Sequence, residues 1–176
     1  MQLSEAISLL KHPLFEGSGK TVWADLGCGN GLFTLALASL LQPGSIIFAV
    51  DKNGKAIQQI PEPDGITLEK IKADFMEDRL PVKNLDGVLM ANSLHFVKDK
   101  QLFLQKMMKW MKPAHALCIV EYDTDKANRW VPYPISFNAL KELLAKEGYS
   151  GMSKINERPS TYSTSLIYAA IALFRP

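Results

Sequence analysis

Short apolar runs alternate with segments of helical periodicity along most of this chain, and no other feature constrains its fold as strongly. The runs are aliphatic or β-branched and are bounded by Gly, Pro or Asn, which is typical of strands buried on both faces of a parallel sheet. They lie at residues 21–26, 45–51, 85–91 and 115–121, with a weaker one at 66–71. Helical spacing is predicted at residues 32–41, 52–60, 99–111 and 136–146. This order implies right-handed crossovers in an open α/β sheet.

The two ends of the chain follow a different pattern. Residues 1–20 are expected to form an N-terminal helical extension, with Leu3 and Ile7 among the residues of its apolar face. At the other end, extended segments at 149–157 and 162–174, joined by a turn at 158–160, are predicted to form a hairpin that closes the sheet edge, although Leu166–Phe174 alone also fits a helix. Because the 176 residues contain no internal repeat or linker, a single domain spanning 1–176 is expected.

Composition excludes several classes of protein. Hydrophobic residues make up 47% of the chain, and 20 Lys and Arg against 18 Asp and Glu leave a net charge of +2. This balance excludes a polybasic arm or an acidic tail, and no nucleic-acid partner is expected. The two cysteines build neither a disulfide framework nor a metal site, so the simplest interpretation is a reducing, cytoplasmic location. The apolar stretches are too short to cross a membrane.

The most specific motif is the loop Asp25–Gly31 (DLGCGNG), which follows one predicted strand and opens a helix. Glycines at alternate positions allow a tight turn with positive φ and allow a ligand to approach the backbone. The free amide groups of the helix start favour an anionic or polar ligand group. Asp51, which stands 20 residues after Gly31 at the end of the next strand, is placed to bind a ribose diol. A nicotinamide dinucleotide is disfavoured because Leu32 occupies the position of the third glycine.

These features and two others carry a family resemblance. Together with Asp51, the strings Val22–Gly31 (VWADLGCGNG), Asp74-Phe75 and Ala91–Phe96 (ANSLHF) resemble the class I S-adenosylmethionine-dependent methyltransferases, closest to the small-molecule branch that includes quinone-biosynthesis enzymes. The resemblance implies a Rossmann-like, doubly wound sheet of seven mostly parallel strands, with an antiparallel edge strand and helices on both faces.

The resemblance also implies a cofactor site for S-adenosylmethionine. Asp25 and the glycine loop would hold the methionine part, and Asp51 the ribose hydroxyls. Asp74 would receive the adenine amine while Phe75 packs on the base. The full set of implied cofactor-binding residues is Asp25, Gly27, Cys28, Gly29, Gly31, Asp51, Lys52, Asp74, Phe75 and Asn92.

The acceptor side is less specific in sequence. His95 is the candidate general base, with a packing histidine as the alternative interpretation. The segment 121–134, an ordinary surface loop on the alternative interpretation, carries polar and aromatic side chains suited to a polar aromatic or acidic acceptor. The candidate substrate residues are Ser93, which the resemblance places where the sulfonium meets the acceptor, and Asp123, Arg129, Trp130 and Tyr133 of this segment.

The predicted function is methyl transfer by in-line attack of an unidentified acceptor, expected to be a small molecule, on the sulfonium methyl. This chemistry needs no metal and no nucleophilic Ser or Cys. Two alternatives stay open, namely a protein or RNA acceptor and a cofactor-binding regulatory module that transfers nothing. Because the chain is close to the bare fold, a second subunit could complete a shallow site, as in a homodimer.

Overall fold

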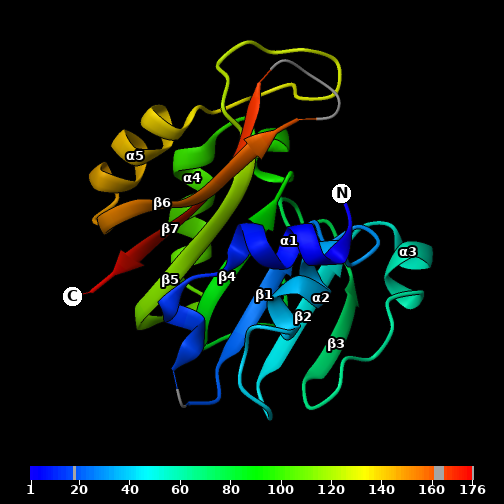
Figure 1. The fold of residues 1–176 in the computed structure, drawn as a ribbon. Coiled ribbons are helices and arrows are strands. Elements are labelled where there is room, and N and C mark those ends of the chain that lie inside the picture. Colours follow the sequence, from blue (N-terminus) through cyan, green and yellow to red (C-terminus); the bar gives the residue numbers. More distant parts are fainter. Residues whose placement is uncertain (18, 161–164, 176) are drawn as a thin grey trace.

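The computed structural model describes residues 1–17, 19–160 and 165–175, and within them a seven-stranded sheet has the order β3-β2-β1-β4-β5-β7-β6 (Figure 1). Strands β1 to β5 run parallel, whereas β7 runs antiparallel to both β5 and β6. The strands are β1 (Val22–Leu26), β2 (Ile46–Asp51), β3 (Thr67–Lys72), β4 (Leu85–Ala91), β5 (Met111–Tyr122), β6 (Ser150–Pro159) and β7 (Leu166–Phe174). The helices are α1 (Leu3–Leu10), η1 (Pro13–Glu16), α2 (Leu32–Ala38), α3 (Gly54–Gln58), η2 (Leu94–Phe96), α4 (Lys100–Met108) and α5 (Phe137–Lys146).

The predicted α/β architecture is confirmed, with an antiparallel hairpin closing one sheet edge. Within this hairpin β7 lies inside and β6 forms the edge, so Leu166–Phe174 is buried between two strands and is not a helix. The turn expected at residues 158–160 is not formed by Arg158 and Pro159, because β6 continues through Pro159. Residues 162–164, which the sequence assigned to the second arm, lie outside the described residues.

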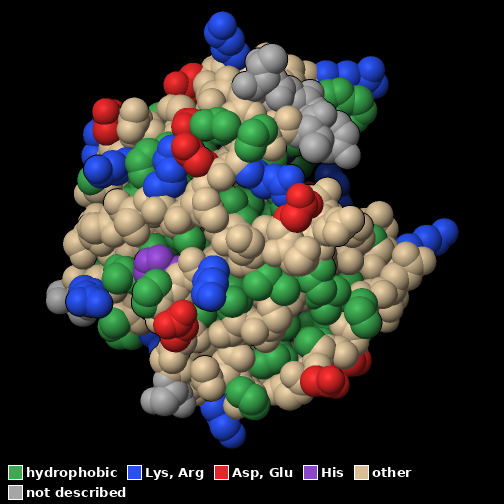
Figure 2. All heavy atoms as spheres, in the orientation of Figure 1, with side chains coloured by type: hydrophobic (Ala, Val, Ile, Leu, Met, Phe, Trp, Pro, Cys, Tyr) green, Lys and Arg blue, Asp and Glu red, His purple; other side chains and the backbone are tan. Residues whose placement is uncertain are grey.

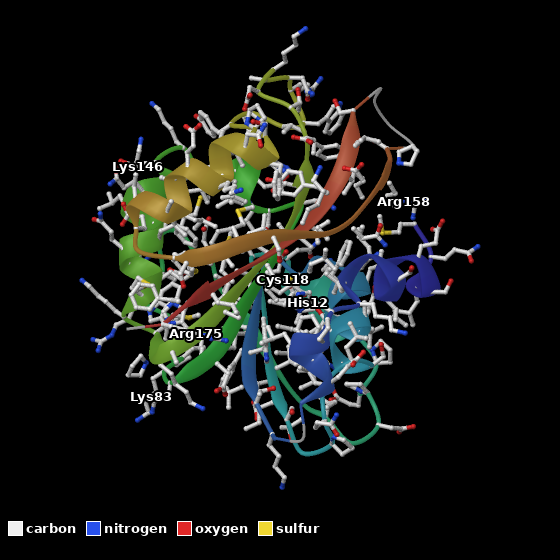
Figure 3. All side chains as sticks on the ribbon, turned by 60° about the vertical axis from the view of Figure 1, so that its left-hand side comes forward. His12, Lys83, Cys118, Lys146, Arg158 and Arg175 are labelled. Carbon is white, nitrogen blue, oxygen red and sulfur yellow. The ribbon has the colours of Figure 1, made fainter. Side chains whose placement is uncertain are left out.

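Helices cover both faces of the sheet, as predicted. α1 and α2 lie on one face, and α4 and α5 lie on the other (Figure 1). Alternate residues of one strand enter the two layers: Trp23 packs with the α1 and α2 side, and Ala24 packs with the α4 and α5 side. Cys118, which Figure 3 places near the middle of the sheet, is fully buried in the first layer.

Local sequence signals explain where the elements begin and end. α5 begins after Ser136, whose hydroxyl accepts a hydrogen bond from Ala139 N at 3.4 Å, as expected of a Ser cap. α3 is shorter than the predicted 52–60, because Asn53 caps it and the chain leaves the helix at Gln59, two residues before Pro61. No helix among the described residues is long and apolar enough to span a membrane.

The parallel strands bring the loops that follow β1, β2, β3, β4 and β5 to one edge of the sheet, where open α/β sheets bind ligands. Figure 2 shows basic and acidic side chains interspersed over one face of the molecule rather than gathered by sign.

Candidate cofactor and acceptor site

The loop after β1 uses its three glycines in two different ways. Gly27, Gly29 and Gly31 have φ values of +80°, +55° and +83°. A Cβ added at Gly27 would lie 2.6 Å from Ser93 Cβ, and one at Gly31 would lie 2.7 Å from Ile60, so packing excludes side chains at both. A Cβ at Gly29 would meet no atom within 4 Å. Gly29 therefore faces open space, as a backbone that receives a ligand must.

Asp51 joins this loop to the loop after β2. Its Oδ2 accepts a hydrogen bond from Gly29 N at 2.8 Å, and its Oδ1 accepts one from Asn53 N at 2.8 Å. The carboxylate thus holds the glycine loop and the start of α3 together. Each of its oxygens retains further acceptor capacity for a ligand hydroxyl.

Asp25 is a carboxyl group enclosed between β1 and α2. It is 1% exposed, and Thr34 Oγ1 donates a hydrogen bond to its Oδ2 at 2.6 Å. Burial raises the pKa of Asp25 to about 7, against the hydrogen bond from Thr34, which lowers it. Within the described part of the chain, Oδ1 of Asp25 and Oδ1 of Asn92 are buried without a hydrogen-bond partner. Two unpaired acceptors at the carboxyl ends of the adjacent strands β1 and β4 fit a ligand that brings N–H donors, such as an ammonium group.

A pocket of about 140 Å³ opens beside these groups. It contains most of the predicted cofactor residues, and also three residues that are not among the predicted site residues, Ala73, Met76 and Phe96. The lining consists of Gly27, Asp51, Lys52, Ala73, Asp74, Phe75, Met76, Asn92, Ser93 and Phe96. The carboxylate of Asp74 also shapes its own turn, since Oδ1 accepts a hydrogen bond from Met76 N at 3.0 Å.

The other predicted cofactor residues lie outside this lining. Asp25 lies near the end of β1, Gly29 and Gly31 lie in the loop that follows it, and Cys28 is buried in the same loop. Burial raises the pKa of the Cys28 thiol far above its ordinary value, and the nearby Asp25 carboxyl raises it further. Cys28 therefore stays protonated and is a packing residue rather than a nucleophile.

His95 lies in η2, directly after β4, and is 3% exposed. Its Nδ1 is 2.8 Å from Oε2 of Glu121, and its backbone N–H donates to Oε1 of the same carboxylate at 3.0 Å. Its ring centroid lies 4.4 Å from that of Phe96 and 6.2 Å from that of Tyr122. Sequence reasoning did not select Glu121, although an acid that ends an otherwise apolar strand is a usable signal.

The loop after β5 encloses a second pocket, of about 710 Å³. Its lining consists of Tyr122, Thr124, Lys126, Ala127, Asn128, Trp130, Val131 and Ser165. Phe96 lines the first pocket and Tyr122 the second; the ring of His95 packs beside both of these rings, and His95 itself is in the lining of neither pocket.

Of the predicted substrate residues, only Trp130 lines the second pocket. It is 76% exposed, and the Arg129 guanidinium lies 5.5 Å from its ring centroid. Ser93 lines the first pocket, where its hydroxyl donates to Leu26 O at 2.6 Å. Tyr133 donates its backbone N–H to His95 O at 3.0 Å.

Asp123 faces α5 instead of either pocket. Its Oδ1 accepts from Phe137 N at 2.9 Å, and its Oδ2 lies 3.7 Å from Lys154 Nζ. Its carboxylate thus organises the start of a helix, and a contact with the acceptor stays a prediction.

The glycine loop after β1, the acid after β2 and the pocket at the carboxyl ends of the strands define a Rossmann-like nucleotide-binding protein. The chain belongs to the methyltransferase family, because the family model described as "Methyltransferase domain" matches residues 18–165. It is an S-adenosylmethionine-dependent methyltransferase, and the prediction of the class I fold is confirmed; a place in the quinone-biosynthesis branch stays a prediction. No curated protein matches it in sequence.

Solved structures of methyltransferases share this fold. The Burkholderia thailandensis 1,6-didemethyltoxoflavin-N1-methyltransferase has a TM-score of 0.73 at 18% identity, over 99% of this chain and 78% of that one. A methyltransferase from Aquifex aeolicus has a TM-score of 0.64 at 15% identity, over 99% of each chain. The plantazolicin methyltransferase has a TM-score of 0.68 at 14% identity, over 98% of this chain and 83% of that one.

Proposed function

We propose that this enzyme methylates a small-molecule acceptor held in the pocket behind the β5 loop, with His95 between that pocket and the cofactor. The observation that carries the proposal is the position of His95, whose neighbours Phe96 and Tyr122 line the two pockets. A methyl group can pass in line only where the cofactor and the acceptor meet, and a site enclosed between two pockets favours such a meeting.

We assign the first pocket and the adjoining glycine loop to the cofactor. The unpaired oxygens of Asp25 and Asn92 suit its ammonium group, Asp51 suits the ribose hydroxyls, and Asp74 suits the adenine amine. Phe75, which lines the same pocket, would pack on the base. When bound, the cofactor supplies a sulfonium methyl that is already electrophilic. The residues of the chain then have to orient the acceptor and exclude water.

Two observations support a small acceptor. The volume of about 710 Å³ lies within the ordinary range for small-molecule pockets. In addition, the Burkholderia thailandensis relative was solved with bound 1,6-didemethyltoxoflavin, which is a small molecule. The exposed indole of Trp130 and the basic group of Lys126 in the pocket favour a flat acceptor with a polar or acidic substituent.

Titration calorimetry tests the cofactor half of the proposal. S-adenosylhomocysteine should bind and NAD should not. Asp51→Ala should weaken S-adenosylhomocysteine by about 1.5–3 kcal/mol, the range for hydrogen bonds to a charged group, and should hardly affect an analogue that lacks both ribose hydroxyls. The matched control is Asp64→Ala, an exposed aspartate in the turn before β3, which should leave both affinities unchanged. Equal losses for the two ligands with Asp51→Ala would show that Asp51 only shapes the loop.

Turnover tests the acceptor half. Release of S-adenosylhomocysteine should be measured over a panel of hydroxylated and nitrogen-containing aromatic acids, with a protein pool and an RNA pool as separate arms. Turnover with a small molecule supports the proposal. Turnover with only the protein pool or only the RNA pool would show that the acceptor is a macromolecule and not a small molecule. Tight cofactor binding without turnover on any of the acceptors would favour the regulatory module.

A further inference from the structure

Two hydrogen bonds join the buried pair of Glu121 and His95. Glu121 ends the buried part of β5 and is 1% exposed. Oε1 accepts the backbone N–H of His95 at 3.0 Å, and Oε2 faces Nδ1 of the same residue at 2.8 Å. The backbone contact is donor-only, because an amide nitrogen cannot accept. A carboxylate accepts at both oxygens, so with Glu121 as the acceptor the bond to Nδ1 requires the proton on that nitrogen.

We propose that Glu121 is a positioning residue that holds neutral His95 as the Nδ1–H tautomer, so that Nε2 is free to take a proton from the acceptor. This inference rests on the proposed function and deepens it. Among the described residues, Nε2 of His95 has no hydrogen-bond partner. Histidine bases are commonly oriented in this way, with the distal nitrogen kept basic by the bond at the other nitrogen.

Two titratable side chains on the neighbouring elements form their hydrogen bonds with other groups and not with Glu121 or His95. Lys100 of α4 donates to Val97 O at 2.9 Å and to Tyr133 O at 2.6 Å. Burial lowers the pKa of Lys100, and the charge of Glu121 opposes that shift. Tyr168 of β7 donates to Ile135 O at 3.1 Å, and burial followed by the charge of Glu121 raises its pKa well above the ordinary value. Both groups are therefore engaged with backbone carbonyls.

Two further groups complete the surroundings. Tyr122 follows Glu121 and places its ring 6.2 Å from that of His95. Asp123 contributes negative charge beyond it but bonds to the start of α5. Among the described residues, the only side chain within hydrogen-bond distance of the imidazole is thus Glu121.

A base at His95 assists only acceptors whose attacking atom carries a dissociable proton, that is, an O–H or N–H group. The acceptor atom forms its bond to the methyl carbon while the carbon–sulfur bond breaks, and the sulfonium becomes a neutral thioether. The proton of the acceptor passes to Nε2 of His95, and the imidazolium later releases it to water. An acceptor that carries no proton on the attacking atom would gain nothing from this arrangement.

The tautomer can be read without any acceptor. Long-range ¹H–¹⁵N correlation spectra at pH 8.5 distinguish the two neutral tautomers, and the chain has three histidines, His12, His95 and His115, so assignment by His95→Ala is direct. We expect the wild-type protein to show His95 with the proton on Nδ1. An Nε2–H tautomer or a doubly protonated ring in the wild type would overturn the proposal, and this result does not depend on any variant folding.

Glu121→Gln should reverse the tautomer while keeping the shape. The glutamine oxygen has to face the backbone N–H of His95, since two donors cannot meet there, and its NH₂ group then faces Nδ1. The ring can accept that donor only with its own proton on Nε2. The matched control is Asp125→Asn, in which a nearby carboxylate that accepts Ser136 N is neutralised. It should leave the His95 tautomer unchanged.

Kinetic and binding measurements distinguish the role of Glu121 from the methyltransfer function itself. With an active O–H or N–H acceptor, Glu121→Gln should lower kcat by about 100-fold or more, the range for general base catalysis, and leave KM and S-adenosylhomocysteine affinity within about twofold. Wild-type kcat in a folded Glu121→Gln protein would overturn the inference alone. Failure of the wild-type protein to bind S-adenosylhomocysteine would instead overturn the proposed function, whatever the tautomer.

Discussion

The cofactor half and the acceptor half of this site are built differently. After β1 and β2 the chain enters a helix within a few residues, and Asp51 accepts hydrogen bonds from the backbone amides of Gly29 and Asn53. After β5 the chain runs from Asp123 to Ser136 before it enters α5, and the indole of Trp130 is 76% exposed. The common cofactor thus meets a rigid frame, whereas the acceptor meets a loop that can vary without disturbing the sheet.

If the cofactor half is a rigid frame, a side chain added inside it should reduce cofactor affinity more than a change of charge in the frame or a truncation in the acceptor loop. Gly29→Val should abolish S-adenosylhomocysteine binding in calorimetry, because the added side chain enters the open space into which Gly29 faces. The variant should also lose about 1–2 kcal/mol of stability, the cost of left-handed backbone for an L-residue, since φ is +55° at this position.

Gly151→Val separates the two effects. Gly151 lies on the edge strand β6, has φ of +70°, and likewise has no atom within 4 Å of an added Cβ. This control should lose comparable stability in chemical denaturation and retain full cofactor affinity. Unchanged affinity in folded Gly29→Val protein would show that the glycine loop does not touch the ligand.

The two halves also differ in how far the sequence predicts them. The strand pattern predicts the sheet, and the motif after β1 together with Asp51 predicts where the cofactor binds, because these depend on local periodicity and on backbone conformation. Of the other residues that line the first pocket, the family resemblance alone implies Asp74, Phe75, Asn92 and Ser93. Pairing of Glu121 with His95 spans 26 residues and follows only from the adjacency of β4 and β5. Asp123 is a residue type that often contacts polar ligands. Its carboxylate instead accepts a hydrogen bond from the backbone N–H of Phe137, 14 residues further along the chain.

A smaller effect is expected from the charge of Asp25. Burial raises its pKa to about 7, so the carboxyl is mostly neutral at pH 6 and mostly ionised at pH 8. If the carboxylate pairs with the ammonium group of the cofactor, affinity for S-adenosylhomocysteine should rise about tenfold between these pH values and level off above them. Calorimetry at pH 6, 7 and 8 checks this, and Asp25→Asn should bind more weakly with a flat profile.

The raised pKa of Asp25 also makes the stability of the protein without cofactor depend on pH. The carboxyl ionises near its ordinary pKa of 3.8 in the unfolded chain but only near 7 in the folded one. The free energy of unfolding contributed by this group should therefore be highest below about pH 4 and be lost as the pH rises to about 7. Asp25→Asn should remove this decline from denaturation midpoints. A wild-type affinity for S-adenosylhomocysteine that falls between pH 6 and 8 would contradict the pairing.

The acceptor half should give the smallest effects, and Trp130→Ala measures them. Because the indole is 76% exposed, its removal should change the free energy of unfolding by no more than about 0.5 kcal/mol. Trp110→Ala, which truncates a tryptophan that is 8% exposed, should cost about 3–5 kcal/mol by the same measurement.

Cofactor affinity should be unchanged in Trp130→Ala, since the residue lines only the second pocket. Loss of one stacking contact is worth about 0.5–1.5 kcal/mol, so KM for an aromatic acceptor should rise roughly 2- to 12-fold at constant kcat. A loss of cofactor affinity in Trp130→Ala would mean that the two halves are coupled, and the contrast between a rigid frame and a variable loop would then fail.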